Sequence, residues 1–320
     1  MLSDPMPVAA FDIFPDGTST PCPDVAGFPH EGATFRWLHF DFSDPHLSTW
    51  CLTHLPALAS RTLLAQRTRP GIDVHGDGLV MTLRGVNLNE GEEVEDMVSL
   101  RLWATETLVV TVRRQRIFAL EDVRDQITDG DAPDSALRLV ARITERLVDR
   151  IETLSLDLED RAETMEDAGY DHQTDPPENL WRTRQQVITL RRHIGPMSEA
   201  LQEFAQIEIP LMKDEFRSRL RHTASRAKRS VDELHEVADR LTALSDHLEL
   251  QQDARLARNS YKLSVIAAIF LPLSFLTGLF GVNVAGMPGM THPYAFTILC
   301  VSMVVLGIAI YALFRFINWF

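Results

Sequence analysis

The chain has 320 residues, of which 24% are charged, and its formal net charge is −14. This acidic balance argues against a nucleic-acid partner, because phosphate backbones require a basic surface. The three cysteines form no C-x-x-C pair, so they predict neither a zinc ribbon nor a redox motif. We find no P-loop, G-x-S-x-G or H-E-x-x-H motif and therefore expect neither an enzyme nor a prosthetic group.

The N-terminal 132 residues predict a flexible arm followed by an α/β domain. Residues 1–30 are rich in Pro, Gly, Asp and Thr without periodicity, so we expect a mobile or loosely docked arm. Between residues 31 and 132, short β-branched and aromatic runs predict strands of a mostly antiparallel sheet. Residues 47–66, between the first two runs, are expected to be helical. The runs read TFRWLHFDF, GLVMTLRGVNL, MVSLRLWA and TLVVTVRRQRI.

The middle of the chain is predicted to be helical. Apolar residues recur near every 3.5 positions from Leu137 to Met165, and a second stripe indicates a helix over about 180–207. We interpret residues 133–208 as a helical hairpin. Neither Gly nor Pro occurs from 211 to 271. One helix over about 211–281 would be roughly 105 Å long, and its 209–262 portion is a stalk that must pack against other helices or subunits.

Two uncharged segments near the C-terminus predict a transmembrane hairpin. Residues 263–281 and 294–314 contain 19 and 21 residues without a charge, and about 20 residues cross a bilayer. A connecting loop, 282–293, and a tail, 315–320, complete the chain. We therefore expect a membrane protein of the α+β class, with lipid as one partner.

The charges that flank the hairpin predict its orientation. Arg255, Arg258 and Lys262 precede the first span and Arg315 follows the second, whereas the loop carries no charge. Cytoplasmic loops are enriched in Lys and Arg, so both termini should be cytoplasmic.

Two spans cannot enclose a pore, so a conduction path requires several copies about an axis. Ser264, Ser274 and Thr277 interrupt the first span and favour it as the lining helix. The alternative is that these hydroxyls only bond back to their own helix. The candidate pore-lining residues are Leu263, Ala267, Leu271, Ser274, Thr277 and Gly278.

The tripeptide Gly281-Val282-Asn283 ends the first span, and Met287-Pro288 follows in the loop. This pattern resembles the signature of the CorA superfamily of divalent-cation transporters, whose usual tripeptide is Gly-Met-Asn. The central Val and the stretch GVNVAGMPG resemble the ZntB-type zinc transporter branch instead. FRWLHFDF, MVSLRLWATETLVVTVRRQRIFAL and LWRTRQQVITLRRHIGPMSEAL are also similar to that branch, in the same order, so the resemblance covers nearly the whole chain after residue 30.

The resemblance implies a homopentamer of the bacterial inner membrane with a cytoplasmic funnel. Asn283 would place a ring of amide carbonyls around the outer mouth, where a hydrated cation can be held. The transported ion would be Zn²⁺, with Mg²⁺, Co²⁺, Ni²⁺ or Cd²⁺ as alternatives. The loop lacks the acidic residue found near Met-Pro in the Gly-Met-Asn branch, which favours zinc. A membrane-anchored scaffold without transport is the alternative from another functional class.

The stalk carries a stripe of acids at intervals of seven residues: Asp232, Asp239, Asp246 and Asp253. They would share one helix face and make a funnel wall that attracts cations, or else a solvated outer face. His235 and Asp239 are four apart and form a possible zinc site, although two ligands are too few without a third. His292 in the loop is a further candidate ligand; the alternative is a solvated side chain.

Overall fold

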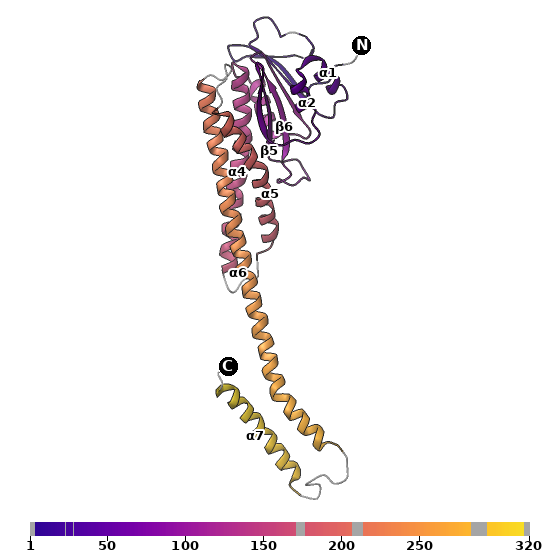
Figure 1. The fold of residues 1–320 in the computed structure, drawn as a ribbon, viewed down its shortest axis with the longest axis vertical. Helices are drawn as coiled ribbons and strands as arrows, with labels where there is room; N and C mark the ends of the chain where they lie inside the picture. The colour runs from indigo at the N-terminus through magenta and orange to yellow at the C-terminus, as the bar shows by residue number, and fades with distance from the viewer. Residues whose placement is uncertain are drawn as a thin grey trace. The chain divides into compact units, whose positions relative to one another are not determined.

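The structure, a computed structural model, describes residues 4–22, 24–27, 29–170, 177–206, 214–282 and 293–316. The chain divides into two compact units, residues 1–245 and 246–320, which are drawn as ribbons in Figure 1. Helix α6, Asp214–Phe280, contributes to both units. The two units are therefore described in turn.

The described residues of the N-terminal unit form a sheet of seven strands in the order β2-β1-β3-β7-β6-β5-β4. Within it, β3 pairs with β7 in parallel and the other pairings are antiparallel, so the sheet is mostly antiparallel, as predicted. The strands are β1 (Ala9–Ile13), β2 (Ser19–Pro21), β3 (Phe35–Asp41), β4 (Gly71–His75), β5 (Gly78–Gly85), β6 (Val98–Ala104) and β7 (Leu108–Arg113).

The two faces of the sheet bury different apolar clusters. Strand residues alternate between faces, so Trp37 joins the larger cluster and Leu38 the smaller one. The larger cluster packs against α3 (Phe118–Thr128) and the long helices, and the smaller one packs against α1 (Leu47–His54) and α2 (Ala57–Leu63). The central strands are consequently buried on both sides.

The expected mobile arm over residues 1–30 is wrong for the segment that forms β1. All five residues of β1 are buried, and the strand lies between β2 and β3. A buried acid hides this strand from pattern analysis. Asp12 is fully buried, and the bond from Arg36 Nε on β3 to its Oδ1, at 2.7 Å, offsets the cost of burying its charge.

The single helical stretch expected over 47–66 is also corrected. It forms two helices, α1 and α2, that meet at Pro56. Proline disfavours helical geometry in the residue before it, and Leu55 is extended, with φ −119° and ψ 155°. The Ser60 hydroxyl donates to the Cys51 carbonyl at 2.7 Å and joins the two helices.

The long helices cover the face of the sheet opposite α1 and α2 (Figure 1). They are α4 (Ala136–Tyr170), α5 (Leu180–Phe204) and the first part of α6, close to the predicted bounds. The predicted apolar stripe of α6 is buried here, with Leu234 1% and Leu241 0% exposed. Near the end of α4 the packing is close, because a Cβ at Gly169 would lie 2.6 Å from Leu244 Cδ1.

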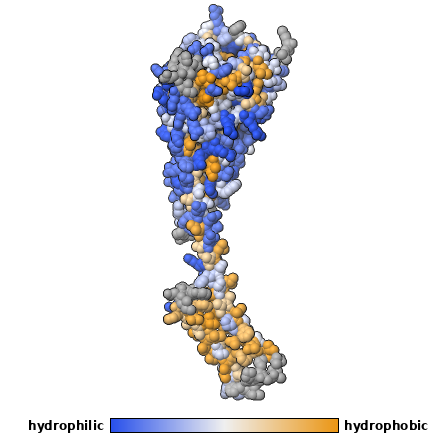
Figure 2. Space-filling view, in the orientation of Figure 1, coloured by the Kyte–Doolittle hydropathy of each residue, from blue (hydrophilic) through white to orange (hydrophobic). Residues whose placement is uncertain are grey.

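In the C-terminal unit, the last part of α6 and helix α7 (Ala295–Phe316) are each long and apolar enough to cross a membrane. In the most apolar 18 residues of each helix, only 6% of α6 and 0% of α7 is buried, so these side chains face outward. Figure 2 shows the resulting hydrophobic surface. The core helices of a soluble protein would be mostly buried; these helices instead need lipid or further protein around them.

Candidate cation pathway

Helix α6 ends one residue before the Gly281-Val282-Asn283 motif. The Gly281 N–H donates to the carbonyls of Thr277 at 2.9 Å and Gly278 at 3.2 Å, which closes the last turn. A Cβ on Gly281 would lie 2.9 Å from the Thr277 carbonyl oxygen. This position therefore favours glycine on steric grounds. Asn283, Met287, Pro288 and His292 lie outside the described residues.

The six candidate pore-lining residues are all exposed on α6. Successive residues from Leu263 to Thr277 are three or four positions apart, and Gly278 is four positions after Ser274, so all six lie along one face of the helix. Ala267, Leu271 and Ser274 also line a shallow groove of about 540 Å³, together with Phe270 and Phe275. Half of the predicted lining residues are therefore brought together at one surface.

The hydroxyls of this span bond to their own helix where a bond is present. Ser264 donates to the Ser260 carbonyl and Thr277 donates to the Ser274 carbonyl, each at 3.0 Å. These bonds use the hydroxyl protons and leave oxygen lone pairs available. The back-bonding alternative thus holds for Ser264 and Thr277, but it does not prevent an oxygen from accepting a bond from a hydrated cation.

The four aspartates of the stalk stripe are exposed, whereas the apolar seam of Leu234 and Leu241 is buried. Asp232 accepts a bond from Lys228 Nζ at 2.7 Å. The stripe is thus a solvent-facing series of carboxylates within each chain.

His235 and Asp239 lie on one face, with Nε2 3.8 Å from Oδ2. The guanidinium of Arg191 contacts the other ring nitrogen of His235. A cation at that position disfavours a second cation on the same imidazole. Within the described part of the chain, no third metal-binding side chain joins this pair.

Sequence reasoning missed a cluster in which the ligand atoms of Asp12, Cys22 and His30 all lie within 4.8 Å. Arg36 donates to both oxygens of Asp12, from Nε at 2.7 Å and Nη2 at 2.9 Å. His30 also donates its backbone N–H to the same carboxylate at 3.0 Å. The acceptor positions that a metal would need are therefore in use.

The Asp12 carboxylate of the cluster forms an ion pair with Arg36. Burial raises the pKa of Asp12, but the bonds from Arg36 and His30 outweigh it and hold the pKa at about 2. Burial raises the pKa of the Cys22 thiol, which donates to the Asp24 carbonyl at 3.2 Å. These residues were hidden from sequence reasoning because they lie in the segment expected to be an arm.

Comparison with known proteins covers both units. The CorA-like Mg²⁺ transporter protein family matches residues 32–315. The chain is 31% identical over 276 residues to the zinc transport protein ZntB of Yersinia pseudotuberculosis, and this alignment covers 86% of this chain and 84% of the relative. It is 32% identical over 271 residues to the zinc transport protein ZntB of Klebsiella pneumoniae, and that alignment covers 84% of this chain and 83% of the relative.

Solved structures share the fold over the full length. The full-length CmaX protein matches with a TM-score of 0.86 and 27% identity over 99% of both chains. The CorA magnesium transporter of Methanocaldococcus jannaschii matches with a TM-score of 0.80 and 17% identity over 98% of this chain and 99% of that one. With two C-terminal membrane helices, a sheet domain and the matched family, this chain belongs to the CorA-like divalent-cation transporters and is not an enzyme.

Proposed function

We propose that this chain forms a homopentameric pore that admits zinc across the bacterial inner membrane into the cytoplasm. The observation that carries this proposal is the Gly281-Val282-Asn283 motif, which directly follows a continuous helix that begins in the N-terminal unit. The relatives named ZntB support zinc as the ion.

Several copies are needed because the two membrane helices of one chain cannot enclose a pore. Copies arranged about an axis would cover one face of α6 and leave α7 toward lipid. The pore-lining face would then include Ser274 and Thr277, whose oxygens can accept bonds from a hydrated cation. The number five comes from the resemblance to the family.

Asn283 is the proposed outer cation site. A ring of amide oxygens holds an ion that keeps its water, so it attracts the cation without binding it too strongly to leave. The membrane potential favours inward movement by ~2.3 kcal/mol per charge per 100 mV, and about twice that for a divalent ion. Residues 263–281 and 294–314 carry no Asp, Glu, Lys or Arg.

The stalk aspartates would raise the local cation concentration in the funnel. Exposed charges act through the solvent, so this effect is screened by salt. A variant with all four aspartates changed to asparagine should lower zinc flux at low ionic strength and leave it nearly unchanged at high ionic strength. A variant whose zinc flux at low ionic strength equals that of the wild type would contradict a funnel role for the aspartates.

Reconstitution in liposomes that contain a zinc-sensitive dye tests the proposal directly. Asn283→Ala should lower flux by about tenfold, equivalent to ~1.4 kcal/mol, without changing the mass of the detergent-solubilised assembly. Thr291→Ala, in the same loop but outside the motif, is the matched control. If liposomes with the wild-type protein admit zinc no faster than empty ones, the hairpin is only an anchor. If magnesium competes at equal concentration, zinc selectivity is refuted and a magnesium, cobalt or nickel pore remains.

A further inference from the structure

The outer face of the sheet, opposite the long helices, is apolar at one end and basic at the other. Strands β5 and β6 pair in a register that sets Val80 opposite Trp103, Thr82 opposite Arg101 and Arg84 opposite Ser99. Alternate residues point to one face, so Trp103, Arg101 and Ser99 lie on the same side of β6. Trp103 belongs to the cluster under α1 and α2. Beyond those helices the face opens into a cleft of about 1010 Å³.

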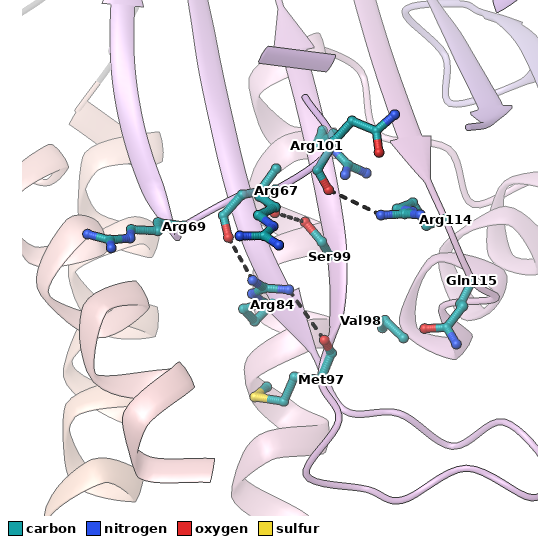
Figure 3. A pocket seen from close by; sticks show the side chains of 11 residues that line it. Arg67, Arg69, Arg84, Met97, Val98, Ser99, Arg101, Arg114 and Gln115 are labelled. Carbon is teal, nitrogen blue, oxygen red and sulfur yellow. Dashed lines mark hydrogen bonds between the residues drawn. The ribbon is translucent and has the colours of Figure 1, made fainter. Parts of the chain in front are cut away.

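Arginine dominates this cleft (Figure 3). In the view of Figure 3, Arg67, Arg84, Arg101 and Arg114 gather around Ser99, while the guanidinium of Arg69 points away from them. No Asp or Glu lines the cleft, and within the described ranges none of the five arginines forms an ion pair. The full lining is Gln66, Arg67, Thr68, Arg69, Arg84, Met97, Val98, Ser99, Arg101, Arg114 and Gln115.

Arg101 forms the buried floor of the cleft and is 1% exposed. Its Nη2 donates to the Ala65 carbonyl at 2.9 Å, whereas its Nε and Nη1 have no partner among the described residues. Its guanidinium carbon lies 4.9 Å from the centre of the Phe42 ring, and that of Arg114 lies 5.3 Å from the same centre. One aromatic ring thus positions two cations.

Arg84 is half-buried, and two backbone carbonyls hold its guanidinium. Its Nη2 donates to the Thr68 carbonyl at 2.8 Å and its Nη1 donates to the Met97 carbonyl at 3.4 Å, while Nε has no described partner. The hydroxyls of Thr68 and Ser99 share a bond at 2.7 Å and add a further donor to the wall. Fixed donors of this kind need no reorganisation to bind an anion.

The same chain provides a comparison for a buried arginine. Arg36, 3% exposed, has its charge compensated by Asp12, whose hydrogen bonds raise the pKa of that guanidinium. Arg101 has no such acid. Burial, Arg114 and Arg84 together lower the pKa of Arg101 to about 10, so it stays protonated at neutral pH. A buried cation without a counter-charge is unfavourable, and an external anion would compensate it.

We propose that this arginine cleft binds a small anion with two or more phosphoryl groups, such as pyrophosphate or a nucleoside di- or triphosphate. Guanidinium forks match phosphate oxygens in pairs, and arginines on several strands can engage successive phosphoryl groups. The volume exceeds the needs of a single orthophosphate and lies at the upper end of the range of small-molecule sites. The cleft belongs to the N-terminal unit, so anion binding can be measured separately from ion flux.

The test is calorimetric titration of the full-length protein in a neutral detergent, with a chelator present so that the anion acts without metal. Inorganic pyrophosphate and ATP should bind at one site per chain, with affinity that falls as salt rises, and adenosine should not bind. Arg114→Gln, an exposed position, and Arg84→Gln should each weaken binding by about tenfold or more. Arg61→Gln, an exposed arginine on α2 outside the cleft, is the matched control.

The proposal is overturned if neither pyrophosphate nor ATP binds, or if Arg114→Gln binds as tightly as Arg61→Gln. Citrate that binds as tightly as pyrophosphate would overturn the phosphoryl assignment in favour of carboxylates. Circular dichroism confirms that each variant is folded. Because Arg114 is exposed, its variant keeps the test decisive even if Arg84→Gln unfolds.

Discussion

Replacing Asp12 by Asn should destabilise the N-terminal unit more than any exposed ion-pair change. The carboxylate is fully buried and accepts two bonds from Arg36, itself 3% exposed. The amide cannot neutralise the guanidinium, so the variant buries a cation without its counter-charge. Removing one partner of a buried pair costs about 3–5 kcal/mol, a large part of the stability of a typical domain.

Thermal unfolding of the full-length protein measures this cost. For a unit of this size, 1 kcal/mol shifts the midpoint by roughly 2–4 °C, so Asp12→Asn should lower it by about 6–20 °C. Asp125→Asn is the matched control, because Asp125 accepts a bond from Arg124 at 2.8 Å on the surface. Exposed pairs contribute ~0–1 kcal/mol. Equal shifts for the two variants would refute the reasoning.

The pH dependence provides a second test of the same pair. The pKa of Asp12 is held at about 2 in the folded state, below its ordinary 3.8. The unfolded chain therefore takes up a proton first as the pH falls. The stabilisation is complete above pH 3.8 and is lost as the pH falls toward 2, about 2 kcal/mol in all. The difference between wild type and Asp12→Asn should narrow through that window.

Three further predictions concern other positions. Burial lowers the pKa of His39 to about 3, and the nearby cation of Arg113 lowers it further. The unfolded chain gains the proton below pH 6.5, whereas the folded chain does not. Acidification from pH 7.5 to 5.5 should therefore lower the free energy of unfolding by about 1.4 kcal/mol, which is measured as a lower thermal midpoint. Gly78→Ala should cost about 1–3 kcal/mol in thermal unfolding, because a Cβ there would lie 2.0 Å from the Trp103 ring. Gly281→Ala should lower zinc flux several-fold in liposomes, because its Cβ would clash with the Thr277 carbonyl.

Each of these predictions has a control in the same chain. His39→Leu should flatten the pH dependence between 7.5 and 5.5, and an unchanged slope would contradict the assignment. Gly71→Ala, on the strand next to Gly78, and Gly307→Ala, on α7, both add a Cβ with nothing within 4 Å. The predictions fail if these alanines are as harmful as those at 78 and 281.

Strong periodicity and long uncharged segments made most of the fold predictable. Strands β3, β5, β6 and β7 and the long helices follow from apolar patterns. The edge strand β4, GIDVH, is short and polar, and β1 contains the buried Asp12. Tertiary pairing rather than local propensity decides both, so neither could be predicted from its own segment.

The candidate pathway and the arginine cleft also differ in whether the sequence alone can locate them. The Gly281-Val282-Asn283 motif is contiguous, so sequence alone locates it. The cleft arginines lie between Arg67 and Arg114 on a loop, two strands and a strand end. Only the register that sets Arg84 opposite Ser99 brings them to one face, and no local pattern in the sequence signals that register.

The parallel pairing of β3 with β7 limits where a soluble fragment can begin and end. A fragment that stops before Leu108 would leave β3, six of whose seven residues are buried, as an open sheet edge prone to aggregation. The larger apolar cluster also includes Leu241 of α6. An expressed fragment should therefore run from before Ala9 to beyond Leu241, and shorter pieces should be found in inclusion bodies.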